Sequence, residues 1–193
     1  QGRFIFDGTI NVANGNEYRM DTGGLNNRGK IHLFAGGTYA ADLHQNGLLE
    51  VNGGGVEESL IVSDDLVFGS PGVTLLNADL HLQGNALIEE GADFNGAGSL
   101  VVRQGAVLGL EHLVSVEAPI ENHGLLELGT VSAFARGVEF TNQSAGTLAI
   151  DLLSAGGVPG PDHDELDLSG TAHLGGRLQV SLLYGFQPSL GDS

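Results

Sequence analysis

Three short stretches of this 193-residue chain decide its fold: GSLVV at residues 98–102, GLLEL at 124–128 and GTLAI at 146–150. Each begins with glycine and continues with apolar residues at alternate positions, which is the pattern of a short β-strand with one buried face. No window shows an apolar stripe at helical spacing, and Gly and Asn interrupt every candidate helix. The sequence therefore predicts an all-β fold.

The same phrase, Gly-x-Leu/Ile-x-Val/Leu/Ile, recurs along the whole chain. Intervals of 21, 18, 51, 26, 22 and 30 residues separate its glycines, which are Gly8, Gly29, Gly47, Gly98, Gly124, Gly146 and Gly176. A degenerate copy that begins at Gly72 divides the long interval into 25 and 26. The mean step is then about 24 residues, which is too long for a meander of such short strands but suits one coil of a solenoid.

We therefore expect a right-handed parallel β-helix of about eight coils of ~24 residues. It forms a single β-helical segment over residues 1–193, with a loop inserted near 155–163. A β-sandwich whose turns recur by chance is the alternative. Stacking would place one residue of each phrase in a single interior ladder: Ile10, Ile31, Leu49, Leu100, Leu126, Leu148 and Leu178.

The residues before these strands suggest how the corners are built. Glycine there permits a corner with positive φ. Asparagine clusters just upstream of several phrases and suits left-handed corners and side-chain amide ladders. These residues are Asn26, Asn27, Asn46, Asn122 and Asn142.

Composition limits the partners. The chain has 32 glycines, 6% aromatic residues, no Trp and no Cys, so disulfides and thiolate chemistry make no contribution. Seven Lys and Arg stand against 24 Asp and Glu, a formal charge of −17. Nucleic acid is a poor partner for such a chain, because binding it requires cations that neutralise phosphates. No apolar run reaches the length of a membrane span, so we expect no direct membrane insertion of this segment.

The densest polar cluster is DHDELD at residues 162–167. Alternate carboxylates on a strand face one side, and hard cations prefer oxygen ligands. Asp162, Asp164 and Glu165 are therefore the candidates for a structural Ca²⁺ site. The alternative is an ordinary solvated strand entry in which Asp164 bonds the amides of a corner.

Catalytic motifs are missing from the sequence. The seven histidines form no H-E-x-x-H motif, His32 and His81 are expected on outer strand faces, and no G-x-S-x-G motif occurs. Cations and aromatic rings that would hold a sugar are far apart in sequence. They are Arg103, Arg136, Arg177, Tyr18, Tyr39 and Tyr184, of which Tyr39 is expected to be exposed. We expect no catalytic residues and no cofactor.

The stretch from Phe140 onward, FTNQSAGTLAIDLLSAGG…DHDELDLSGTAHLGGRLQVSLLYGFQPSLGDS, resembles a known family. It looks like the C-terminal part of the autotransporter-like β-strand-repeat proteins, long exported bacterial proteins of planctomycete type. The similarity covers residues 140–193, and looser copies lie near residues 95–102 and 122–128. In one departure, Asp-Glu-Leu at residues 164–166 stands where Asp-Gln-Leu is commoner.

This resemblance implies export, a β-helical stalk and a parent protein much longer than 193 residues; it transfers no functional residues. We expect a non-catalytic structural or adhesive segment, secreted or on the surface of a Gram-negative-type bacterium. A carbohydrate-binding module or a polysaccharide-degrading lyase or glycosidase is the alternative. Expected partners are cell-surface or environmental polysaccharides and, through an incompletely capped C-terminal end, further copies of the chain.

Overall fold

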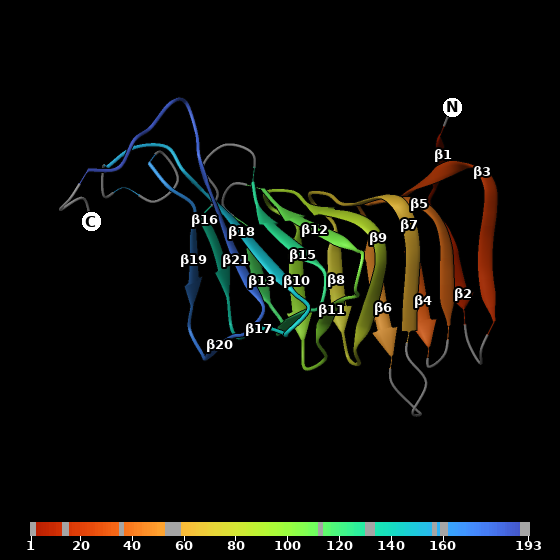
Figure 1. The fold of residues 1–193 in the computed structure, drawn as a ribbon. Helices are drawn as coiled ribbons and strands as arrows, with labels where there is room; N and C mark the ends of the chain where they lie inside the picture. The colour runs from red at the N-terminus through yellow and green to blue at the C-terminus, as the bar shows by residue number, and fades with distance from the viewer. Residues whose placement is uncertain are drawn as a thin grey trace.

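The computed structural model describes residues 3–12, 16–34, 37–52, 59–111, 114–129, 134–155, 158 and 162–189. All regular secondary structure in these residues is β-strand, and every pair of neighbouring strands in both sheets is parallel. Figure 1 shows the strands stacked one beside the next along a single axis, with the two termini at opposite ends. The expected parallel β-solenoid is confirmed.

The larger sheet, sheet 1, has thirteen strands in the described residues. They are β1 (Arg3–Phe6), β3 (Glu17–Asn27), β5 (Thr38–Gln45), β7 (Ser59–Phe68), β9 (Leu80–Ile88), β11 (Leu100–Val102), β12 (Val107–Leu110), β14 (Ile120–Asn122), β15 (Leu125–Leu128), β17 (Phe140–Asn142), β18 (Thr147–Leu152), β20 (Ala172–Leu174) and β21 (Arg177–Leu182).

The other sheet, sheet 2, stacks eight strands, one after each passage of the chain through sheet 1. They are β2 (Thr9–Val12), β4 (Lys30–Phe34), β6 (Leu48–Asn52), β8 (Val73–Leu76), β10 (Asp93–Gly96), β13 (Ser115–Glu117), β16 (Phe134–Gly137) and β19 (Glu165–Leu168).

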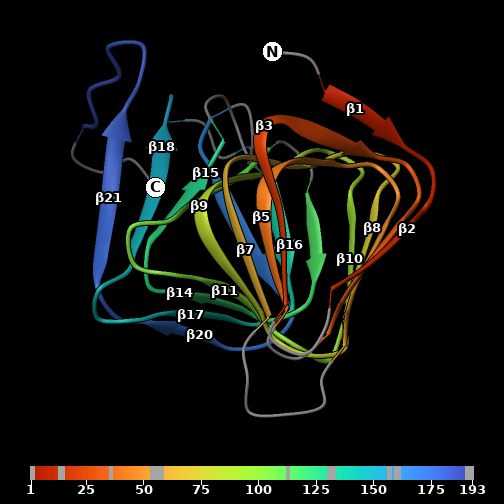
Figure 2. The same cartoon turned by 90° about the vertical axis from the view of Figure 1, so that its right-hand side faces the viewer.

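Sheet 1 bends to form two of the three faces of the solenoid. In β9 one long strand covers both, because its first half pairs with β11 and its second half with β12. Gly84 lies at the bend with φ of 110°, and a Cβ there would collide with the Ser63 carbonyl of the preceding coil. From β11 onward each face has a strand of its own, as the view along the axis in Figure 2 shows.

The coils are less uniform than the expected eight of about 24 residues. Partner residues on neighbouring strands of sheet 2 are separated by 21, 18, 25, 20, 22, 21 and 31 positions. The largest step includes the segment near 155–163, where residues 156–157 and 159–161 lie outside the described part of the chain. The predicted loop is thus only partly visible, at the longest coil.

The predicted single interior ladder is wrong. Ile10, Ile31 and Leu49 pair with one another on sheet 2, but Leu100 lies on β11 and Leu126 on β15, on the two faces of sheet 1. The glycine phrase therefore marks the start of a strand at any corner of the coil. Because the copies lie at different corners, the mean interval between their glycines is longer than most of the coils.

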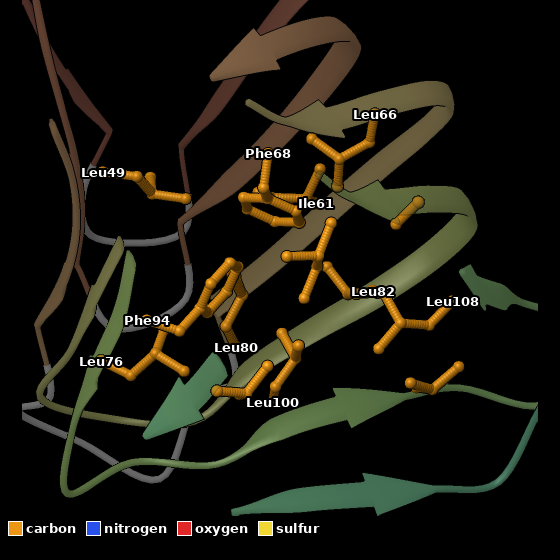
Figure 3. Packing of buried hydrophobic residues seen from close by; sticks show 14 of the residues in the cluster. Leu49, Ile61, Leu66, Phe68, Leu76, Leu80, Leu82, Phe94, Leu100 and Leu108 are labelled. Carbon is orange, nitrogen blue, oxygen red and sulfur yellow. The ribbon is translucent and has the colours of Figure 1, made fainter. Parts of the chain in front are cut away.

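The interior consists of apolar ladders, one on each face. On sheet 2, Leu49 is followed along the ladder by Thr74 and Phe94, all at most 1% exposed. Leu80 pairs with Leu100 on the first face of sheet 1, and the side chains of all three faces converge in Figure 3. Phe68 and Phe94 meet edge to face with 4.8 Å between ring centroids. A single hydrophobic cluster therefore runs through successive coils of the stack.

Glycine is required at the strand starts for a different reason from the one expected. Of the eight glycines that begin a phrase, only Gly176 has a positive φ. A Cβ on Gly29, Gly47 or Gly124 would instead collide with a backbone carbonyl of the preceding coil. Strands in one ladder lie about 4.8 Å apart, so the backbones approach too closely at these corners for any side chain.

The expected amide ladders are present, but the expected left-handed asparagines are not. The Asn27 Nδ2 donates to Oε1 of Gln45 at 2.9 Å, and the Asn122 Nδ2 donates to Oδ1 of Asn142 at 2.8 Å. Asn27 and Asn122 each also accept the amide of the glycine two residues further on, at 3.1 Å. Tyr184 is the one non-glycine residue with positive φ in the described part of the chain. The asparagines therefore stabilise corners through their side chains.

At the C-terminal end the inner ladders reach solvent. Leu174 is 72% exposed and Leu178 is 61% exposed, although both continue ladders that are buried further back. The last strands, β20 and β21, each pair on one side only among the described residues.

The close approach at the corners gives a test. Gly47→Ala should lower the free energy of unfolding by about 1–3 kcal/mol, because its Cβ must displace the backbone of the preceding coil. Gly109→Ala is the matched control, since its Cβ comes close only to the flexible end of the Leu87 side chain, at 3.0 Å, and lies 3.8 Å from the Ala86 carbonyl oxygen. Urea unfolding of both variants checks this. Equal losses in the two variants would contradict the explanation.

Candidate functional site

The acidic cluster predicted as a calcium site serves the chain itself. Asp164 is 5% exposed, and its Oδ2 accepts the Asp151 amide at 2.7 Å. Asp162 accepts the Ser154 hydroxyl on Oδ1 and the Val158 amide on Oδ2, the latter at 3.1 Å. The carboxylates thus hold the turn before β19. This arrangement matches the alternative in which Asp164 bonds a corner amide.

Glu165, the third candidate, lies beside these residues at the start of β19. Its Oε2 is 3.7 Å from Nε2 of His163. Within the described residues, no group of three or more His, Cys, Asp or Glu side chains is placed to hold a metal ion. Structural Ca²⁺ at Asp162, Asp164 and Glu165 stays a prediction.

A hollow of about 490 Å³ lies on the outer face of sheet 1, over β9, β11 and β14. Its lining residues come from three successive coils and include one arginine and two histidines but no carboxylate. They are His81, Gln83, Val101, Arg103, Gln104 and His123. Figure 2 shows β11 and β14 side by side on this face. The hollow therefore combines one cation, two imidazoles and two amides on a chain whose net charge is −17.

The stacking of coils brings these side chains together. His81 is the register partner of Val101, and Val101 is the partner of Glu121. Arg103 and His123 follow directly after β11 and β14, so they occupy equivalent positions in neighbouring coils. Val101 is only 5% exposed and forms an apolar floor beneath the polar groups.

Hydrogen bonds fix the groups on both sides of the hollow. The Arg103 Nε donates to Nδ1 of His81 at 3.5 Å. Neutral His81 therefore carries its ring proton on Nε2. On the far side, Oε1 of Glu121 accepts from the Gln143 amide at 2.7 Å and lies 3.0 Å from Nε2 of His123. Glu121 is thus held beside the hollow rather than lining it.

Burial lowers the pKa of His81, because the imidazolium is desolvated between the coils. The nearby carboxylates of Asp79 and Glu121 oppose this effect by favouring the charged ring, and His123 adds to the lowering. The net effect is a pKa of His81 below its ordinary value. A negative charge brought into the hollow would raise its pKa and favour protonation.

The sequence did not reveal this site, although it contained the signal. In the sequence, Arg103 is far from the two other arginines of this part of the chain, Arg136 and Arg177. His81, Arg103 and His123 are 22 and 20 positions apart, which is one coil each. Residues at this spacing can be recognised as neighbours only when the coil length is known.

His32 is the second histidine expected on an outer face. Its Nδ1 lies 2.7 Å from Oε2 of Glu50, on the next strand of sheet 2.

The tyrosine expected to contact a glycan is buried. Tyr39 is fully inside the core and stacks on Tyr18 with 5.0 Å between ring centroids. Its hydroxyl has no hydrogen-bond partner among the described residues, and burial raises its pKa strongly. The expectation of an exposed Tyr39 is wrong because Tyr39 pairs with Ile61 in an inward ladder. Tyr184 is 78% exposed.

These features define the class of the molecule as a parallel β-solenoid with a hollow that contains Arg103 on one outer face. Comparisons with protein-family models, curated proteins and solved structures find no match. The described residues contain no helix that is long and apolar enough to cross a membrane.

The Asp162 contacts predict a pH dependence of the turn. The Ser154 hydroxyl and the Val158 amide lower the pKa of Asp162 by bonding its ionised form. The ionised Asp162 carboxylate therefore stabilises the turn at pH values above its ordinary pKa of about 3.9. This stabilisation is lost as the pH falls through the lower pKa that Asp162 has in the folded chain. In an NMR pH titration the Val158 amide signal should shift with a midpoint below about 3.9, and Asp162→Asn should abolish the shift. A midpoint at or above the ordinary value contradicts this.

Proposed function

We propose that the chain is a non-catalytic structural or adhesive segment of a large secreted or cell-surface bacterial protein. The observation that carries the proposal is the continuous in-register stack of parallel strands around one apolar core. Eight strands at about 4.8 Å spacing give a rod about 35–40 Å long. Such a rod holds its ends apart and offers long flat faces, which are the properties of a stalk.

Export and the autotransporter-like family belong to the proposal through the sequence resemblance of residues 140–193. This stretch contains β17 to β21, which continue the pairing of the preceding strands. The repeats therefore extend the rod in the way that a passenger-type stalk requires. The surface of a Gram-negative-type bacterium is the proposed location.

Carbohydrate binding is the second candidate, and the hollow at Arg103 favours it. Small-molecule sites typically enclose about 300–1,000 Å³ and combine an apolar surface with a few convergent polar groups. The hollow has a volume within that range, an apolar floor at Val101 and polar groups from three coils. An adhesive solenoid that holds a polysaccharide on this face combines both candidates.

A paired assay tests the proposed function. The intact chain is screened on a glycan array and incubated with a panel of acidic and neutral polysaccharides, with and without Ca²⁺. We expect no new reducing or unsaturated sugar ends, because the proposed role involves no bond cleavage. Released sugar that disappears on heat inactivation of the chain would overturn the non-catalytic proposal and favour the polysaccharide-degrading alternative.

End-to-end association of two copies is proposed for the isolated chain. At the C-terminal end, exposed Leu178 and Val180 continue a buried ladder, and β1 and β2 form an edge at the other end. Pairing of these edges would bury apolar surface and complete two ladders. In sedimentation velocity, the sedimentation coefficient of the chain should rise with concentration. The double variant Leu178→Lys and Val180→Lys should abolish this rise. A chain that stays monomeric at high concentration contradicts it.

A further inference from the structure

The hollow over β9, β11 and β14 differs in charge from the rest of the surface. Residues 46–193 contain twenty acidic residues and three basic ones, and Arg103 is one of the three. A second hollow, of about 230 Å³ over β13 and β16, is lined by the carboxylates Glu117 and Asp167 and by no cation. An anion would therefore be favoured in the first hollow and disfavoured in the second.

The net charge of −17 does not prevent an anion from entering this site. At physiological ionic strength, charges are screened beyond about 8 Å. Arg103 lines the hollow, whereas the Glu121 carboxylate lies beside it and accepts from the Gln143 amide. The charges close to a bound anion decide whether it binds, and Arg103 supplies a positive charge at every physiological pH.

We propose that this hollow binds an acidic sugar residue, with its carboxylate or sulfate on the Arg103 guanidinium and its ring over Val101. Gln83 and Gln104 supply amide groups that can both donate to and accept from sugar hydroxyls. The volume of about 490 Å³ exceeds what a bare inorganic anion fills and suits a short stretch of a saccharide. The inference deepens the adhesive form of the proposed function and rests on it.

The histidines make this binding dependent on pH. Protonation of His81 places a second positive charge against Arg103, and a bound anion relieves that repulsion. Asp79 before β9 and Glu121 on β14 also favour the protonated ring, whereas His123 after β14 opposes it. A site that gains a proton together with its anion binds that anion more tightly as pH falls.

The test uses the intact chain and three probes in titration calorimetry or NMR. The probes are a galacturonic acid trisaccharide, the same trisaccharide as its neutral methyl ester, and inorganic sulfate. We expect the acid form to bind, the ester to bind at least about tenfold more weakly, and sulfate to bind more weakly than the acid trisaccharide. Binding of the acid trisaccharide should be severalfold tighter at pH 5.5 than at pH 7.5.

Variants locate the site. Arg103→Gln should weaken binding of the acid trisaccharide about tenfold or more, and Arg177→Gln, at an exposed arginine on β21, should leave it unchanged. Melting temperatures of both variants identify a folding defect, in which case Gln104→Ala, which removes an amide from the lining of the hollow, replaces Arg103→Gln and should also weaken binding. A variant at the hollow that binds like the parent chain overturns the proposal.

The remaining outcomes separate this inference from the proposed function. Equal binding of the acid and its ester overturns the anionic site, and sulfate binding as tightly as the trisaccharide overturns its assignment to a sugar. If no probe binds and no polysaccharide is cleaved, the hollow is not a saccharide site and the structural stalk stands. Cleavage together with Arg103-dependent binding overturns the non-catalytic function and leaves the anionic site intact.

Discussion

Parallel strands of neighbouring coils must hydrogen-bond in register, at a spacing of about 4.8 Å, and the rest of this structure depends on that constraint. Each side chain lies on the equivalent side chain of the next coil, so residues that face the interior stack on one another. At the corners the backbones come so close that a Cβ on Gly29 or Gly47 would strike the carbonyl of the preceding coil. The glycines of this chain reflect the spacing between coils more than unusual backbone angles.

The same stacking decides what the interior can contain. An apolar ladder such as Leu49, Thr74 and Phe94 admits a hydroxyl but no charge. Where amides enter, they enter in pairs, as Asn122 on Asn142 and Asn27 on Gln45, because one side chain then bonds the other. The Tyr39 hydroxyl and the Gln45 Nε2 are nevertheless buried without a partner among the described residues. Tyr18 stacks on the ring of Tyr39, with 5.0 Å between the ring centroids.

On the outer face, stacking has the opposite effect, because it gathers unlike residues from distant parts of the sequence. His81, Arg103 and His123 lie on separate coils, yet they line one hollow. A solenoid can thus build a site from one residue per coil while the interior stays uniform. The core of the stalk and the proposed saccharide site use different residues of the same strands, because alternate residues of a strand face opposite sides.

The sequence by itself determined the all-β class, the parallel solenoid, the need for glycine before strands and the amide ladders. Periodic signals carry these features, and every coil repeats them. It did not determine which corner each phrase occupies, so Leu100 and Leu126 were placed in one ladder although they lie on different faces. It also misplaced Tyr39 and left Arg103 isolated. Those facts depend on the length of each coil, which varies here from 18 to 31 residues. Only the tertiary structure fixes that length, because it is set by how the chain turns at corners that have no periodic signal.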